Sequence, residues 1–122
     1  MKYIKTYKSL YESVNEKELQ IGDYVICSEN DPGSVEEIQN FINNNIGKFI
    51  RYRIDTDTRV SLQFDHMIQY EYVPPEIIEE DFDFGENSNE YNTRLMKKSE
   101  IKYWSENKED LEQLLLNNKF NI

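Results

Sequence analysis

The chain has 122 residues, which is enough for one domain (1–122) with a single hydrophobic core. It carries 24 acidic residues against 14 lysines and arginines, and the formal net charge of -10 disfavours binding to a phosphate backbone. Aromatic residues make up 13% of the chain, which argues against wholesale disorder. We therefore expect a folded, soluble, acidic domain.

Cysteine and histidine each occur once, as Cys27 and His66. The sequence thus excludes an internal disulfide, a thiolate metal cluster and a site built from several imidazoles. Residues 1–13 lack the apolar core of a signal peptide, and no apolar run approaches the ~20 residues that cross a bilayer. We expect a cytoplasmic protein with no membrane partner, no metal and no cofactor.

The first pattern is in residues 1–20, where apolar side chains recur at intervals of three and four residues. These side chains are Tyr3, Ile4, Tyr7, Leu10, Tyr11 and Val14. The spacing predicts an amphipathic helix that either covers the domain or docks on a partner. In the second case, Tyr3, Tyr7 and Tyr11 would be partner-binding residues.

A strand and a helix are predicted next. A glycine-aspartate turn leads into the β-branched and aromatic run 21–27, which favours a strand. Ser34 and Glu37 then have the spacing of a capping box, and apolar residues continue at helical intervals over 35–45. Gly47 suits the position just after the end of this helix.

Alternating side chains then predict consecutive antiparallel strands joined by short turns. The alternation runs through 48–54, 60–64 and 66–72. Pro74 and Pro75 end the series, because proline cannot donate a hydrogen bond to a strand ladder.

Residues 76–90 contain seven acidic residues and no basic one, which predicts a long acidic loop. Glu79, Glu80, Asp81 and Asp83 would bind a partner if this loop imitates a phosphate backbone and is steered by charge toward a basic groove. The alternative is a solvated loop that aids solubility.

The last part of the chain is predicted to return to the sheet and to end in a helix. Residues 93–97 favour a strand, whereas 99–104 fits either a strand or a helical turn. Asn107 is a suitable cap, with acidic residues in the following turn and leucines on one face, so we place the C-terminal helix at 105–122.

Together these elements predict an α+β domain. Its centre would be a small antiparallel sheet over 21–104, curled into a closed or nearly closed barrel, with an inserted helix and a C-terminal helix. The G-D-x-V run within 21–27 and the I-G pair within 45–50 resemble the opening strands of SH3-like barrels of the KOW type. This resemblance implies an SH3-like β-barrel. The inserted helix and the acidic loop depart from that family, so its nucleic-acid contacts are not expected here.

A second resemblance concerns the origin of the chain. The opening MKYIKTYKSLYES at 1–13 and the closing WSENKEDLE at 104–112 resemble segments of small uncharacterised proteins of large tailed bacteriophages. The bias toward asparagine, isoleucine and lysine suits the AT-rich genomes of such phages. The resemblance implies a host cytoplasm or a virion as the setting, and it assigns no functional residue.

Catalytic and metal-binding residues are only weakly indicated. Cys27 and His66 would form a nucleophile and base only if they met, and a cysteine at the end of an apolar strand is typical of a buried structural residue. Asp55 and Asp57 have the spacing of carboxylate ligands but lack the central glycine and closing glutamate of a calcium loop.

One combination of basic and aromatic residues suggests a sheet face that stacks on single-stranded nucleic acid. Its members are Arg51, Arg53, Arg59, Tyr52, Tyr70 and Tyr72. The charge balance of the chain argues against this interpretation, so neither nucleic acid nor a small-molecule substrate is an expected partner.

We therefore predict a non-enzymatic protein of the phage type that acts through protein–protein contacts in a structural or assembly role. The alternative is an acidic inhibitor, or DNA mimic, of a host nucleic-acid-binding or defence protein. A small hydrolase that uses Cys27 or a bound metal is the third interpretation.

Overall fold

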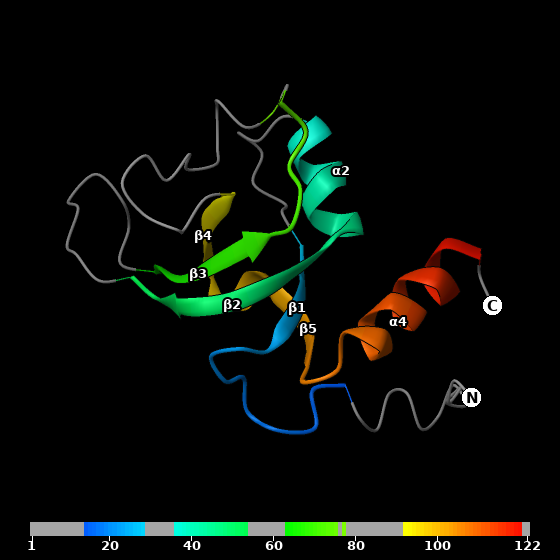
Figure 1. The fold of residues 1–122 in the computed structure, drawn as a ribbon, viewed down its shortest axis with the longest axis horizontal. Helices are drawn as coiled ribbons and strands as arrows, with labels where there is room; N and C mark the ends of the chain where they lie inside the picture. The colour runs from blue at the N-terminus through cyan, green and yellow to red at the C-terminus, as the bar shows by residue number, and fades with distance from the viewer. Residues whose placement is uncertain (1–13, 29–35, 54–62, 76, 78–91, 121–122) are drawn as a thin grey trace.

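The computed structural model describes residues 14–28, 36–53, 63–75, 77 and 92–120 (Figure 1). The elements in chain order are β1 (Tyr24–Cys27), α2 (Glu36–Asn44), β2 (Ile46–Tyr52), β3 (Phe64–Tyr70), β4 (Thr93–Lys97), the 3₁₀ helix η1 (Lys98–Glu100), β5 (Ile101–Ser105) and α4 (Lys108–Phe120). The fold class is α+β, as the sequence predicts.

The five strands form one sheet in the order β4-β3-β2-β1-β5, and every neighbouring pair is antiparallel. The last strand, β5, therefore pairs with the first strand, β1. The predicted closure of a barrel is not found: among the described strands β4 and β5 remain the two edges. The short helix η1 carries the chain from β4 to β5 without a ladder between them.

The two helices cover opposite faces of the sheet, because alternate side chains of β1 point to opposite sides. Val25 and Cys27 lie in the larger core cluster with the buried α2 residues Ile38 and Ile42. Ile26 lies in the smaller cluster with α4. The other members of the smaller cluster are Val14, Leu111 and Leu114. Each residue of β1 from Val25 onward is buried, so β1 forms the centre of the structure.

Most predicted elements agree with the structure to within a few residues. The strand at 21–27, the helix at 35–45 and the strand at 93–97 correspond to β1, α2 and β4. The segment 99–104 combines both alternatives, since η1 precedes β5. The predicted C-terminal helix corresponds to α4.

The N-terminal prediction is only partly open to comparison. Residues 1–13 lie outside the described part of the chain, as do all residues of 76–90 except Ile77. Within 1–20, the described residues 14–20 are not helical. They run past the edge of the sheet instead, because hydrogen bonds from Asn15 hold them to β5.

Asn15 holds this segment with three hydrogen bonds to the outer edge of β5. Its backbone N donates to Trp104 O at 3.0 Å, its Nδ2 donates to Lys102 O at 3.0 Å, and its Oδ1 accepts from Trp104 N at 2.8 Å. The indole Nε1 of Trp104 also donates to Lys17 O. Asn15 has a positive φ of 59°, a conformation that asparagine tolerates better than most residues.

The glycine-aspartate turn before β1 is present. Asp23 N donates to Gln20 O at 3.0 Å, while Gln20 N donates to the buried carboxylate of Asp23 at 2.8 Å. Gly22 has a φ of 101°, which suits the third position of a type II turn. The turn thereby sets the entry of the chain into β1.

Gly47 has a different role from the predicted one. It is the second residue of β2 and does not follow the helix as a cap. The Asn44 and Asn45 side-chain amides donate to Asn40 O and Phe41 O, and they satisfy carbonyl groups at the end of α2. A cap glycine is therefore not needed there.

Candidate functional site

The seven predicted partner-binding residues lie outside the described part of the chain. They are Tyr3, Tyr7, Tyr11, Glu79, Glu80, Asp81 and Asp83. Asp55, Asp57 and Arg59 lie outside it as well. Their roles stay predictions.

Cys27 and His66 are at opposite ends of the sheet. Ile26 pairs with Ile46 at the start of β2, whereas His66 pairs with Tyr52 at its end. The six residue steps from Ile46 to Tyr52 span about 20 Å of strand. Cys27 is 1% exposed within the larger core cluster, so the geometry gives no support to a hydrolase built on this pair.

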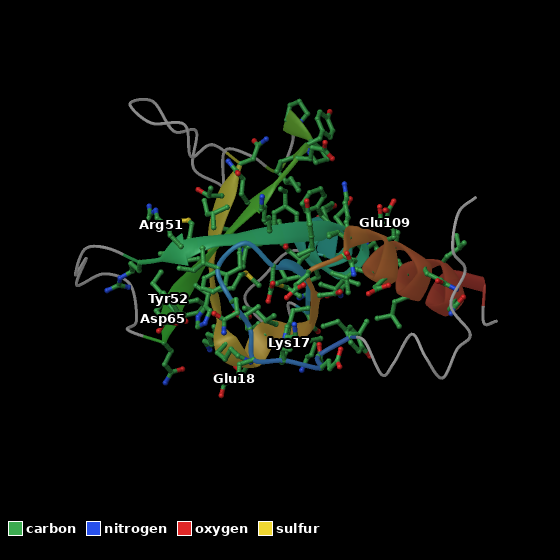
Figure 2. The ribbon with its side chains drawn as sticks, turned by 60° about the horizontal axis from the view of Figure 1, so that its bottom comes forward. Lys17, Glu18, Arg51, Tyr52, Asp65 and Glu109 are labelled. Carbon is green, nitrogen blue, oxygen red and sulfur yellow. The ribbon has the colours of Figure 1, made fainter. Side chains whose placement is uncertain are left out.

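His66 instead belongs to an aromatic cluster at the far end of β2 and β3. A register shift after Phe49 places Phe49 and Tyr52 on the same face, with ring centroids 4.9 and 5.1 Å from the imidazole. The Nδ1 of His66 lies 2.6 Å from Asp65 Oδ1, and Arg53 N donates to Asp65 O. Figure 2 shows Tyr52 and Asp65 at the opposite end of the molecule from Glu109 of α4. We interpret this cluster as structural.

The tyrosines of the predicted basic-aromatic face do not lie together on one surface, so they do not form a platform on which bases could stack. Tyr70 is 2% exposed in the core, Tyr52 ends β2 and pairs with His66 near the start of β3, and Tyr72 lies two residues past the end of β3. The guanidinium of Arg51 donates to Tyr52 O at 3.0 Å. The three rings are thus distributed over three different environments.

A groove that sequence reasoning missed lies where β2 begins and β3 ends, between the C-terminal end of α2 and α4. It is open to solvent and has a volume of about 430 Å³. Its lining consists of Phe41, Asn44 and Asn45 at the end of α2, Ile46 of β2, Tyr70, Glu71, Tyr72 and Pro74 at the end of β3, and Lys108, Glu112 and Leu115 on α4. In the sequence, the one local signal of the α4 wall is the i, i+4, i+7 spacing of its three lining residues, which places them on one face of the helix.

Buried polar contacts fix the wall that α4 contributes. Ser105 Oγ donates to Asp110 Oδ2 at 3.0 Å and accepts from Asn107 N at 3.1 Å. Ser105 ends β5 and Asp110 is in the first turn of α4, so these contacts hold the start of the helix to the sheet. Leu111 and Leu114 then pack it onto β1.

The groove carries more negative than positive charge. Glu71 and Glu112 line it together with a single basic residue, Lys108, whose Nζ lies 3.4 Å from Glu71 Oε2. Both partners of this ion pair are solvent-exposed, so it adds little stability. The last turn of α2 has no basic residue, and the partial negative charge of a helix C-terminus therefore adds to the carboxylates.

Charge is also divided between the sheet and the helices. The strands contain Lys48, Arg51, Arg94, Lys97 and Lys102 against one acidic residue, Asp65. The two helices contain Glu36, Glu37, Glu109, Asp110 and Glu112 against Lys108 and Lys119. The groove thus lies between the acidic elements of the fold.

No family model, curated protein or solved structure matches this chain. In the described residues there is no group of three or more histidine, cysteine, aspartate or glutamate side chains that could hold a metal ion. None of the helices in the described residues is long and apolar enough to cross a membrane. Our candidate functional site is the groove between α2 and α4, because it combines open volume with exposed aromatic surface and an excess of negative charge.

Proposed function

We propose that this chain is a non-enzymatic accessory protein that acts through protein–protein contacts, and that a short segment of its partner binds the groove. The observation that carries this proposal is the open groove itself, whose lining combines apolar and aromatic side chains with amide and charged groups. Tyr72 lines it with 68% of its surface exposed, and large aromatic side chains of this kind are frequent anchors of interfaces.

An SH3-like scaffold is part of this proposal. Two features support it: the strand order β4-β3-β2-β1-β5, with the last strand beside the first, and the 3₁₀ helix between β4 and β5. Folds of this kind host many unrelated functions, so the scaffold by itself assigns none. The setting that we propose is a phage virion or the cytoplasm of its host, on the resemblance of 1–13 and 104–112 to phage proteins.

Replacing Tyr72 by alanine is expected to reduce capture of the partner about tenfold, because the exposed ring is lost from the groove while the core is left intact. The measurement is affinity capture from bacterial lysate, quantified by mass spectrometry. Tyr52→Ala is the matched control, since Tyr52 is a 49% exposed tyrosine at the far end of the sheet. Equal capture by wild type and Tyr72→Ala would contradict the proposal.

The acidic-inhibitor alternative is favoured by the seven acidic residues of 76–90. If the chain mimics DNA, replacing Glu79, Glu80, Asp81 and Asp83 by their amides should abolish binding to a basic, nucleic-acid-binding host protein, and high salt should do the same. For the groove-binding accessory we expect capture to survive these four substitutions. Parallel captures at low and high salt separate the two functions.

A further inference from the structure

We propose that the groove binds a partner segment in which lysine or arginine stands next to an aromatic or aliphatic anchor. This inference rests on the proposed function, because it names the chemistry of the partner that the same groove holds. Two sets of observations support it, one for the apolar anchor and one for the cation.

The anchor site is formed by side chains that are only partly covered. Phe41 and Leu115 are half-buried on the two helix walls, and Tyr72 is mostly exposed at the rim. Phe41 packs edge-on against the buried Tyr70 ring, with centroids 5.2 Å apart, so this wall has a fixed position. An aromatic or aliphatic side chain placed here would remove apolar surface of all three from water.

Three sources of negative charge surround the cation site. Glu71 and Glu112 contribute carboxylates, and α2 directs its C-terminus at the groove with no basic residue in its last turn. Lys108 is the one cation that lines the groove, and it already faces Glu71. A lysine or arginine of the partner would thus face Glu112 and the end of α2, and its one competitor among the lining residues is Lys108, which is already paired with Glu71.

The charges of the described strands and helices favour the same partner. A basic segment is attracted to the acidic helices and is repelled by the strands, which carry five basic residues and one acidic residue. This arrangement orients the encounter as well as stabilising the complex. An acidic segment would be repelled by the same helices at the groove.

The test uses the full-length chain and a random 12-residue peptide display library. We expect the enriched peptides to carry more Lys and Arg than Asp and Glu, together with an aromatic or aliphatic residue. When the best peptide is synthesised and titrated, the side-chain amide NMR signals of Asn44 and Asn45 should shift, because these amides line the groove.

Charge reversal at the groove provides the decisive variant. Glu71→Lys/Glu112→Lys should weaken binding of that peptide about tenfold, because two attractive contacts become repulsive. The matched control is Glu16→Lys/Glu18→Lys, the same change of net charge at two exposed residues that do not line the groove. We expect the control to bind within about twofold of wild type, since neither side chain lines the groove and salt screens exposed charges.

Three outcomes would overturn this inference. Enriched peptides that shift Asn44 and Asn45 but are neutral or acidic would leave the proposed function intact and refute only the partner chemistry. Basic peptides that bind Glu71→Lys/Glu112→Lys as tightly as wild type would place the contact elsewhere. Peptides that bind only after removal of residues 1–13 would identify the chain's own N-terminal segment as the occupant. Failure of the proposed function is seen separately, as capture that does not depend on Tyr72.

Discussion

Replacing Gly47 by alanine is expected to lower the free energy of unfolding by about 3 kcal/mol. Gly47 pairs with Val25 of β1 on one side and with Tyr70 of β3 on the other. A Cβ at this position would overlap Ile68 Cγ2 and would lie 3.1 Å from the Tyr70 ring. Because Ile68 is fully buried, its methyl group has no free space into which to move.

The sign of this effect is informative. In a strand without such crowding, alanine is more stable than glycine by about 0.5–1 kcal/mol, because glycine loses more conformational entropy on folding. Urea unfolding followed by circular dichroism measures the difference for Gly47→Ala. A neutral or stabilised variant would contradict the close approach of β2 and β3 at Gly47.

Measuring Gly47→Ala in a chain that also carries a substitution at Ile68 tests whether contact with Ile68 causes the loss of stability. Leucine has no branch at Cβ, so Ile68→Leu removes the methyl group that a Cβ at Gly47 would meet. We expect Gly47→Ala to cost about half as much in this background as in wild type. Equal costs in the two backgrounds would show that Ile68 is not the cause.

Replacing Asn15 by alanine is expected to cost about 2 kcal/mol. The variant loses both side-chain hydrogen bonds to β5, each worth about 0.5–1 kcal/mol at an exposed position, and it must also hold a positive φ. Thermal unfolding measures the loss. The magnitude is smaller than for Gly47→Ala because water replaces the lost partners.

Two further variants at Asn15 separate the causes. Asn15→Gly loses the same side-chain hydrogen bonds but adopts positive φ without strain, so we expect about half the cost of Asn15→Ala. Asn15→Asp keeps the acceptor for Trp104 N but loses the donor to Lys102 O, and we place it between wild type and alanine. Equal stability of Asn15→Ala and Asn15→Gly would exclude backbone strain as a contribution.

The elements that could be predicted from the sequence are those with strong local signals. A turn of glycine and aspartate precedes β1, and helical spacing of apolar residues marks α2. The segment 99–104 stayed ambiguous because its conformation depends on pairing with β1, far away in the sequence. The local sequence predicts a helix-end role for Gly47, because nothing in it reveals the close approach of Ile68 from the neighbouring strand.

The candidate site could not be predicted for a related reason. The unusual compositions of 1–13 and 76–90 mark those segments as candidate binding regions, whereas the groove is assembled from three segments of ordinary composition at 41–46, 70–74 and 108–115. Only the fold brings these segments together. The predicted closure of the barrel is not found for the same reason. Closure depends on how β4 and β5 lie relative to each other, and no local sequence pattern encodes that arrangement.

The position of β5 beside β1 has a consequence for synthesis of the protein. Paired residues such as Tyr24 and Ser105 are separated by roughly 80 residues, and contacts of such long range form slowly. During translation, β1 leaves the ribosome long before β5 exists to cover its second edge. The sheet is therefore completed only after Ile101–Ser105 has emerged, and a nascent chain stalled before Ile101 would expose β1 to aggregation.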